Sequence, residues 1–254
     1  MSLLILKIGG SVITEKDAVS CARKDEIDRI SQEIASFKVN SQDAIILVHG
    51  AGSFGHPQAM KWVTGGFDAQ GVYLTHSSVK LLNSMMLDSL NTAGIRALPV
   101  HPLSSCLLEN GKIVEFNLGQ IKLMLERGVV PVLHGDVVMD RAKGAAVLSG
   151  DRIVPYLASV MNASKIGAGS NVDGVLDDTG AVIKKITPVS FIDIKKHIQG
   201  SGSADVTGGM LGKVSEFLEL AKSGTSSRIF NASRKGMVSK FLYGEDVGTL
   251  IADK

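Results

Sequence analysis

The sequence predicts an α/β fold in which helices cover both faces of an open, parallel or mixed sheet. Short apolar runs typical of buried strands alternate along the chain with longer amphipathic segments. Two of the apolar runs, at residues 3–8 and 44–48, end directly in glycine-rich turns. The 254 residues are 44% hydrophobic and 20% charged, which is an ordinary composition for a globular α/β protein.

The predicted strands are continuous aliphatic runs, as expected for strands that are buried on both faces of a parallel sheet. They comprise residues 3–8, 44–48, 96–100, 129–133, 165–168, 228–231 and 248–252. Three hairpins are also predicted, at residues 105–115, at residues 137–148 and around residues 177–180. The first should turn at Asn110-Gly111, a strong signal for a two-residue turn.

The predicted helices alternate with these strands and comprise residues 24–38, 75–93, 118–127, 151–163, 188–197 and 210–222. The first carries one apolar stripe, formed by Ile27, Ile30, Ile34 and Phe37. Gly94 follows the second helix as a C-cap. Segments 12–16, 63–71 and 198–209 are expected to be loops, and no linker or repeat divides residues 1–254, so we expect a single domain.

The bulk composition argues against several classes of protein. A net charge of +2 is too small to indicate binding to nucleic acid or to a membrane surface. No apolar run approaches the roughly 20 residues of a membrane span, and we expect the start of the chain to be a strand rather than a signal peptide. Cys21 and Cys106 match no metal motif and fit a reducing, cytoplasmic location.

The sequence GAGSFGH at residues 50–56 is a candidate phosphate cradle. It follows a predicted strand and precedes Pro57, a residue suited to a first helical position. Its glycines let the backbone approach a ligand closely, and a helix start offers free N–H groups to an anion. His56 adds a side chain that can carry a positive charge near neutral pH.

Two other interpretations of this loop stay open. Residues 50–55 match G-x-G-x-x-G, which also occurs in dinucleotide-binding domains. Dinucleotide-binding domains have an acidic residue about 20 positions further on, after a second strand. Asp68 is near that distance but has no predicted strand before it. The third possibility is a tight turn that binds nothing.

Three lysines are candidates for holding phosphate. Lys7 lies inside an apolar strand, which is costly unless its ammonium group reaches an anion, and the alternative is that it extends into water. Lys213 is predicted in the first turn of a helix, where the dipole favours anions; it either meets a bound phosphate or pairs with Glu216. Lys16 lies in a loop and is uninformative by itself.

Two aspartates complete the set of candidates. Asp151, in the sequence SGD at residues 149–151, is either a helix N-cap or a carboxylate that orients lysines without binding metal. Asp173 is a turn aspartate by default. The remaining histidines are scattered and are expected to be structural rather than catalytic: His49, His76, His101, His134 and His197.

Neither a metal-ligand cluster nor a Ser/His/Asp constellation is evident, and we therefore predict no protein ligand for a metal. Residues 208–213 do not satisfy the Walker A spacing. Separated lysines, two glycine loops and one histidine, with no evident general base, favour phosphoryl transfer, which depends on positioning and charge neutralisation.

The motifs together resemble the amino acid kinase superfamily, in the order in which that family has them and over nearly the whole chain. They are KIGGS at residues 7–11, GAGSFGH at 50–56, SGD at 149–151, NVDGV at 171–175 and GGMLGK at 208–213. Within the superfamily, ITEK at residues 13–16 and the Ser-Phe-Gly-His ending of the second motif resemble the isopentenyl phosphate kinases. Fosfomycin kinases share much of this pattern and are the alternative.

The resemblance implies a three-layer αβα sandwich with an open, mainly parallel sheet, assembled as a homodimer. It implies transfer of the ATP γ-phosphate, with Mg²⁺, to isopentenyl phosphate, a small-molecule phosphate substrate, in isoprenoid biosynthesis by an alternative mevalonate route. We place the acceptor in the part up to about residue 165 and the nucleotide in the part from about residue 166. A regulatory module that binds ATP without chemistry is a further alternative, against which the full set of lysines and His56 argues.

The resemblance also implies roles for individual residues. His56 would bond the acceptor phosphate, Lys16 would lie between donor and acceptor, and Asp151 would orient the lysines. The expected ATP-binding residues are Lys7, Ile8, Gly9, Gly10, Ser11, Gly52, Asp173, Gly209 and Lys213. Ala51 and Gly150 would contact the acceptor through their backbones. Ala51 departs from the glycine that is common in the family and requires a negative φ.

The isoprenoid tail needs an apolar pocket. The helix predicted from residue 75 offers Val79, Leu82 and Met86 as a candidate wall, and the alternative is that this stripe is ordinary core.

Overall fold

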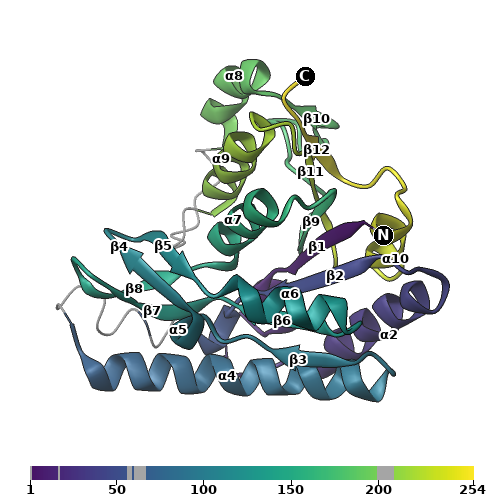
Figure 1. The fold of residues 1–254 in the computed structure, drawn as a ribbon. Helices are drawn as coiled ribbons and strands as arrows, with labels where there is room; N and C mark the ends of the chain where they lie inside the picture. The colour runs from purple at the N-terminus through teal and green to yellow at the C-terminus, as the bar shows by residue number, and fades with distance from the viewer. Residues whose placement is uncertain (1, 17, 56–58, 60–66, 199–208) are drawn as a thin grey trace.

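The computed structural model describes residues 2–16, 18–55, 59, 67–198 and 209–254. Its main sheet has eight strands in the order β10-β12-β11-β9-β1-β2-β6-β3 (Figure 1). The strands are β1 (Leu3–Ile8), β2 (Ala44–His49), β3 (Ala97–Pro99), β6 (Val130–His134), β9 (Lys165–Ser170), β10 (Lys185–Ile186), β11 (Ser227–Asn231) and β12 (Thr249–Ile251). Only β11 and β12 pair antiparallel among the paired neighbours, so the predicted mainly parallel sheet is confirmed.

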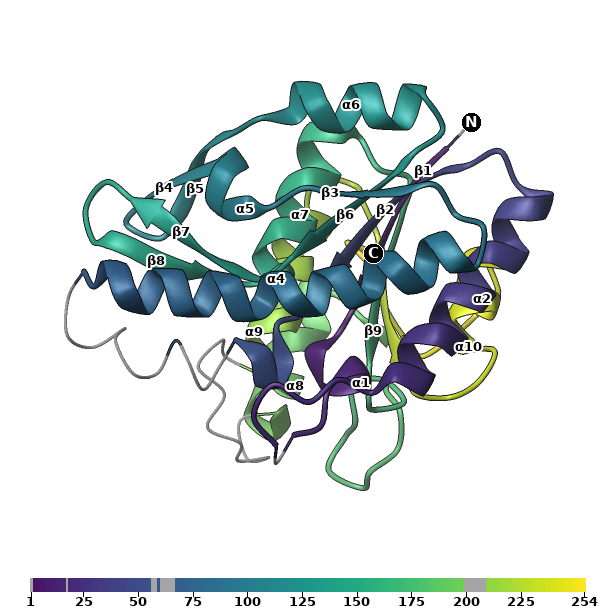
Figure 2. The same cartoon turned by 90° about the horizontal axis from the view of Figure 1, so that it is seen from below.

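Helices cover both faces of this sheet, and each face has its own core. One layer comprises α6 (Leu118–Glu126), α7 (Gly150–Met161), α8 (Pro188–Ile198) and α9 (Gly209–Ala221). The other comprises α2 (Lys24–Asn40), α4 (Ala69–Thr92) and α10 (Met237–Tyr243) (Figure 2). The result is the expected three-layer αβα sandwich.

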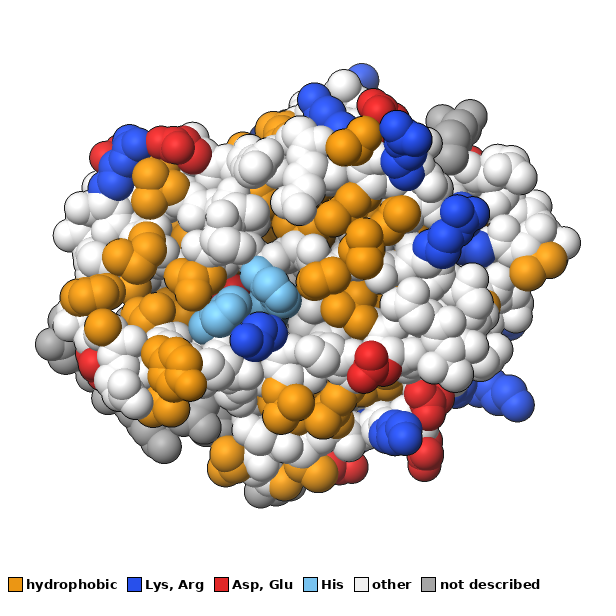
Figure 3. Space-filling model, turned by 60° about the horizontal axis from the view of Figure 1, so that its bottom comes forward, with side chains coloured by type: hydrophobic (Ala, Val, Ile, Leu, Met, Phe, Trp, Pro, Cys, Tyr) orange, Lys and Arg blue, Asp and Glu red, His pale blue; other side chains and the backbone are white. Residues whose placement is uncertain are grey.

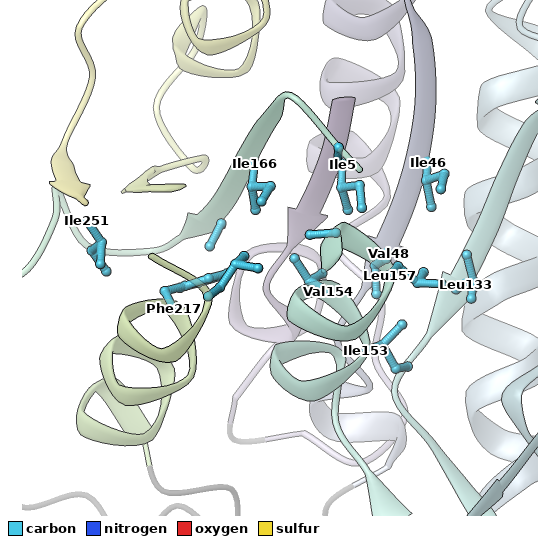
Figure 4. Packing of buried hydrophobic residues seen from close by; sticks show 14 of the residues in the cluster. Ile5, Ile46, Val48, Leu133, Ile153, Val154, Leu157, Ile166, Phe217 and Ile251 are labelled. Atoms are coloured by element: carbon cyan, nitrogen blue, oxygen red, sulfur yellow. The ribbon is translucent and has the colours of Figure 1, made fainter. Parts of the chain in front are cut away.

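The alternation of side chains along β1 explains how one strand serves both cores. Leu4, Leu6 and Ile8 pack in the core with α2 and α4, whereas Ile5 packs with α7 and α9 (Figure 4). Successive side chains of a strand point to opposite faces. Lys7 therefore points to the same face as Ile5, toward α7.

A second, four-stranded sheet joins the two hairpins in the order β5-β4-β7-β8. The hairpins themselves were expected: β4 (Cys106–Glu109) with β5 (Lys112–Phe116), and β7 (Asp136–Asp140) with β8 (Gly144–Leu148). Asn110 and Gly111 both have positive φ, as a type I′ turn requires. The sequence did not predict that β4 would pair parallel with β7. The Asp140 carboxylate supports this junction, because it accepts hydrogen bonds from the backbone N–H groups of Asn110 and Gly111.

Several boundaries differ from the prediction for local reasons. The helix predicted from residue 75 begins at Ala69, because Asp68 caps it by accepting a bond from Gln70 N, so residues 69–71 are helical and not irregular. Part of the loop predicted at residues 12–16 lies in the short helix α1 (Gly10–Ile13). α10 was not predicted from the sequence, and it packs Val238, Phe241 and Leu242 into the core. Apart from its two ends, the loop expected at residues 198–209 lies outside the described residues.

The loops after β1 and β2 are in direct backbone contact. A Cβ on Gly10 would lie 2.3 Å from Gly52 N, and a Cβ on Gly50 would lie 2.4 Å from Gly10 N. Neither contact leaves room for a side chain. The glycines at these positions therefore let the two loops touch at the end of the sheet.

None of the helices in the described part of the chain is long and apolar enough to cross a membrane.

We expect Gly10→Ala to lower the free energy of unfolding by about 1–3 kcal/mol, because its methyl group would overlap backbone atoms that cannot move independently. Gly119→Ala is the matched control. Gly119 is exposed within α6, and a Cβ there would meet only Asn117 Oδ1 among the described residues, at an ordinary contact distance of 3.6 Å. Gly119→Ala should therefore raise the free energy of unfolding by up to about 1 kcal/mol. Urea unfolding of both variants measures the difference, and equal effects would contradict the proposed contact.

Candidate active site

Lys7, the glycine turns that begin at Gly9 and Gly50, and Asp173 lie at or just after the carboxyl ends of the central parallel strands β1, β2 and β9. β1 lies between β9 and β2, and later strands of the chain extend the sheet on both sides of β1. Open α/β sheets bind ligands at such a switch point. Three backbone hydrogen bonds join the loops there: Gly9 N donates to Gly169 O (2.7 Å), Gly50 N to Ile8 O (2.8 Å) and Gly135 N to His49 O (2.9 Å).

Lys7 and Asp151 form an ion pair at the centre of this edge. Lys7 Nζ lies 2.6 Å from Asp151 Oδ1, and Lys7 is only 5% exposed. The alternative in which Lys7 extends into water is therefore wrong. Asp151 lies in the first turn of α7, whose N-cap is Ser149, so the alternative in which Asp151 is the N-cap is also wrong. A carboxylate in a first helical turn is stabilised by the helix dipole.

The charge of Lys213 also acts on Asp151. Burial by itself would raise the pKa of the Asp151 carboxyl, but the charges of Lys7 and Lys213 and the hydrogen bond from Lys7 hold it below its usual value. Asp151 is therefore ionised at neutral pH. α9 begins at Gly209, which places the half-buried Lys213 just after the first turn rather than within it. Two lysines that lie far apart in the sequence thus act on one carboxylate.

The glycine loop after β2 has the conformation that its sequence requires. Gly52 has a φ of +49°, and its neighbour Thr14 fixes the loop: Thr14 Oγ1 donates to Gly10 O (2.8 Å) and accepts from Ser53 N (3.1 Å). Ala51 has φ −77° and ψ −28°, which an alanine adopts without strain. Ala51 therefore has the negative φ that an alanine requires at this position, where the family commonly has glycine.

The backbone amides expected to bind the acceptor lie around Gly135. A Cβ on Gly135 would lie 3.5 Å from Gly150 N and 3.6 Å from Ala51 N. A Cβ on Gly150 would lie 3.3 Å from Lys7 Cε and from Val48 Cγ1. Glycine at both positions leaves space beside the two amides and beside the Lys7 ammonium group.

Asp173 lies in the loop after β9 and is held by two side chains. It accepts hydrogen bonds from Asn231 Nδ2 (2.8 Å), at the end of β11, and from Arg234 (2.6 Å). Lys16 is exposed in the loop after α1, and Ser11 is exposed within α1. His56 lies outside the described residues. The roles given to all of these residues stay predictions.

The candidate wall of the tail pocket divides into two parts. Leu82 and Met86 belong to the core shared with α2 and the sheet, as the alternative interpretation held. Val79 faces the glycine loop instead, because a Cβ on Gly55 would lie 3.4 Å from its Cγ2. Leu82 and Met86 share their core cluster with Phe54 of the same loop.

The structure brings together four of the histidines that appeared scattered in the sequence. His101 Nδ1 lies 2.8 Å from His134 Nε2, the rings of His49 and His134 stack at 5.6 Å, and His76 contacts the Asp136 carboxylate at 3.0 Å. Figure 3 shows histidine side chains at the surface, next to a basic side chain and near hydrophobic ones. The sequence signal was that His49 and His134 each stand between a strand and a glycine.

The described residues contain no group of three or more His, Cys, Asp or Glu side chains placed to hold a metal ion. Mg²⁺ in nucleotide sites takes many of its ligands from phosphate and water, with one or two carboxylates. The residues at this edge therefore fit an ion that arrives with the nucleotide better than a permanently bound one.

Comparisons with known proteins show which family this chain belongs to. Residues 2–231 match the model of the amino acid kinase family. The chain is 40% identical over 253 residues to the isopentenyl phosphate kinase of Haloferax volcanii, with 99% of each chain covered. It is 36% identical to the isopentenyl phosphate kinase of Methanocaldococcus jannaschii, with 98% of each covered.

A solved structure of an isopentenyl phosphate kinase superposes with a TM-score of 0.83 at 33% identity, covering 98% of this chain and all of the other. The match extends over both layers of helices and the sheet between them. The chain therefore belongs to the amino acid kinase family, and the two relatives compared above are isopentenyl phosphate kinases of that family.

Proposed function

We propose that this chain is an ATP-dependent kinase that phosphorylates isopentenyl phosphate to isopentenyl diphosphate. The observation that carries the proposal is the buried Lys7–Asp151 pair with Lys213 beside it, at the edge where two glycine loops meet. Relatives that match over nearly the full length of the chain carry the same activity in their names. No relative among these comparisons favours the fosfomycin alternative.

In the proposed reaction, an oxygen of the acceptor phosphate attacks the γ-phosphorus of ATP. The bond from that phosphorus to the oxygen bridging the β- and γ-phosphates breaks, and ADP leaves with the electron pair. A phosphate acceptor is largely ionised at neutral pH, so no general base is needed. The protein's task is to align two anions and neutralise their charge.

Lys7 and Lys213 supply that charge in our proposal, and Asp151 sets the position of Lys7. A flexible ammonium group loses rotamer freedom when it is fixed, and the 2.6 Å bond to Asp151 fixes it before substrate binds. Asp151 is a positioning residue, since it acts through Lys7. Lys16 would reach between the donor and acceptor phosphates from its loop.

The two substrates are assigned to different loops. The acceptor phosphate would meet His56 and the amides of Ala51 and Gly150, in the part of the chain up to about residue 165. The nucleotide would contact residues 7–11, Gly52, Asp173, Gly209 and Lys213, the last three of which belong to the part from about residue 166. ATP would bring Mg²⁺ with it, and we assign no residue of this chain as a ligand of the ion.

We further propose that the protein is a cytoplasmic homodimer. The outer face of α4 carries the exposed apolar residues Tyr73, Leu81 and Met85 at four- and eight-residue spacings, so they form one stripe. A second copy of the chain would bury this apolar stripe, which is exposed to water in the monomer. The two free cysteines fit a reducing compartment.

The acceptor is tested by coupled ADP release over isopentenyl phosphate, dimethylallyl phosphate, fosfomycin, UMP and acetylglutamate. We expect the highest kcat/KM with isopentenyl phosphate, because the site combines phosphate-binding amides with an apolar neighbour, Val79. Faster turnover of fosfomycin would overturn the assignment. ATP binding without turnover of any acceptor would favour the regulatory alternative.

Replacing either predicted phosphate-binding side chain should slow the reaction. We expect His56→Ala and Lys213→Ala each to lower kcat by about 10²–10³-fold, the usual loss for one transition-state donor. Lys222→Ala is the control, since Lys222 is exposed just beyond α9 and pairs with Glu219. Steady-state kinetics measure all three, and near-normal turnover in the His56 or Lys213 variant would refute that residue's role.

Asp151→Asn should reduce both stability and turnover. The variant leaves the buried Lys7 ammonium group without a charged partner, so we expect a loss of about 1–3 kcal/mol in the free energy of unfolding. Glu115→Gln breaks the exposed pair with Arg141 and should cost less than about 1 kcal/mol. Urea unfolding and kcat are measured together, and an Asp151→Asn variant that is normal in both would contradict the role of the pair.

A further inference from the structure

β2 and β6 both end in a histidine that is followed by glycine. His49 and His134 are partners in the parallel register, and their rings stack with an interplanar angle of 29°. Each ring bonds the carbonyl of the glycine after it: His49 Nδ1 lies 3.0 Å from Gly50 O, and His134 Nδ1 lies 3.1 Å from Gly135 O. The same local arrangement thus occurs twice, side by side, directly below the glycine loops.

The hydrogen-bond partners assign the protonation of both rings. A carbonyl only accepts, so each Nδ1 must carry a hydrogen. His49 Nε2 lies 3.0 Å from Asn83 Nδ2, which only donates, so His49 Nε2 has no hydrogen. Burial lowers the pKa of His49 to about 3 and that of His134 to about 4, so both rings are neutral at pH 7. His134 Nε2 therefore accepts a hydrogen bond from His101 Nδ1 at 2.8 Å.

The orientation of the Asn83 amide can be checked by comparing it with the opposite orientation. Asn83 Oδ1 is buried and has no hydrogen-bond partner among the described residues. Turning the amide round would bring that oxygen to His49 Nε2, but it would then require the hydrogen to be on Nε2 and leave Nδ1 facing Gly50 O without one. The fold thus tolerates a buried unpaired oxygen, which is costly, while His49 keeps its hydrogen on Nδ1.

Fixing the Gly50 carbonyl also fixes the Ala51 N–H, because both belong to the same peptide. A trans peptide is planar, with C=O and N–H pointing in opposite directions, and the described chain has no cis peptide. The Gly50 carbonyl points to His49, so the Ala51 N–H points away from it. None of the described residues accepts a hydrogen bond from Ala51 N. Gly135 bonds the His134 ring through its carbonyl and donates its N–H to the backbone carbonyl of His49. A Cβ on Gly135 would lie within 3.6 Å of both Ala51 N and Gly150 N, so Gly135 packs against both amides.

We propose that His49 and His134 are positioning residues which act as neutral Nδ1–H tautomers. His49 holds the peptide that carries the Ala51 N–H, and His134 holds Gly135, which packs against the Ala51 and Gly150 amides, so that both amides face one acceptor phosphate. The proposal rests on the proposed function for the identity of that phosphate. It adds two residues that act only through the backbone. Their loss should weaken binding of the acceptor and leave binding of ATP nearly unchanged.

Two amide substitutions at His134 separate positioning from packing. His134→Asn places an N–H group where Nδ1 stands, whereas His134→Gln places it where Nε2 stands. His134 is chosen because its outer partner, His101, is half-exposed and can turn to water. We expect the glutamine variant to raise KM for isopentenyl phosphate about tenfold, the equivalent of one lost hydrogen bond, and the asparagine variant to stay within about threefold.

The KM for ATP and the thermal midpoint are measured on the same samples. An unchanged ATP KM, within about twofold, supports positioning of the acceptor loop, since a general distortion of the site would raise the KM of both substrates. The thermal midpoint reports any loss of folding separately. Equal rises in both KM values, or identical behaviour of the asparagine and glutamine variants, would overturn the proposal.

The tautomers are tested separately in the unaltered protein by ¹⁵N NMR of the histidine rings at pH 7. We expect two neutral rings with hydrogen on Nδ1, assigned by their loss in His49→Asn and His134→Asn. Hydrogen on Nε2, or a charged ring at either position, would overturn the proposal whatever the substrate is. If the acceptor panel instead refutes isopentenyl phosphate, the proposed function fails, and the KM comparison is made with the acceptor that the panel identifies.

Discussion

A lysine at the end of a buried strand needs an anion within reach, and in this protein that anion is Asp151. The side-chain alternation of β1 points Lys7 to the face covered by α7, and α7 begins where its first-turn carboxylate meets the ammonium group at 2.6 Å. Burial by itself would raise the pKa of the Asp151 carboxyl, but the charges of Lys7 and Lys213 hold that pKa below its usual value. The start of α7, the end of β1 and Lys213 on α9 are thus held in one arrangement by charge.

The second constraint is steric. The loops after β1 and β2 meet through backbone atoms alone, with Gly10 against Gly52 and Gly50 against Gly10. Neither contact tolerates a Cβ, so the loops can close on each other only with glycine at these places. This close approach brings the two loops together beside the Lys7–Asp151 pair. A positive group and free amides at one sheet edge are what two phosphate groups need when they must approach each other.

The stacked His49 and His134 rings are buried polar groups that bond backbone carbonyls. Such groups can have a structural role rather than a catalytic one. Their hydrogen bonds to the following glycine carbonyls are local in sequence, but the stacking, the Asn83 contact and the His101 contact join α4, β2, β6 and the turn after β3. Burial lowers the pKa of the His49 and His134 rings, so both are uncharged at neutral pH.

The sequence by itself determined the alternation of strands and helices, the mainly parallel sheet, the hairpin turn at Asn110-Gly111 and the kinase family. Apolar runs, glycine turns and the order of motifs are local properties of the chain, so they can be read without the fold. The same is true of Lys7 and Asp151 as candidates, because a lysine in an apolar strand and an aspartate at a helix start are each visible alone.

Only the tertiary structure decided which candidates meet. The choice between a Lys7 that reaches water and one that reaches Asp151 depends on a contact across 144 positions of sequence, and so does the role of Asp151 as a partner rather than an N-cap. The parallel pairing of β4 with β7 and the gathering of four histidines are also long-range contacts. Local sequence preferences carry no information on such contacts, because the packing of distant elements against one sheet creates them.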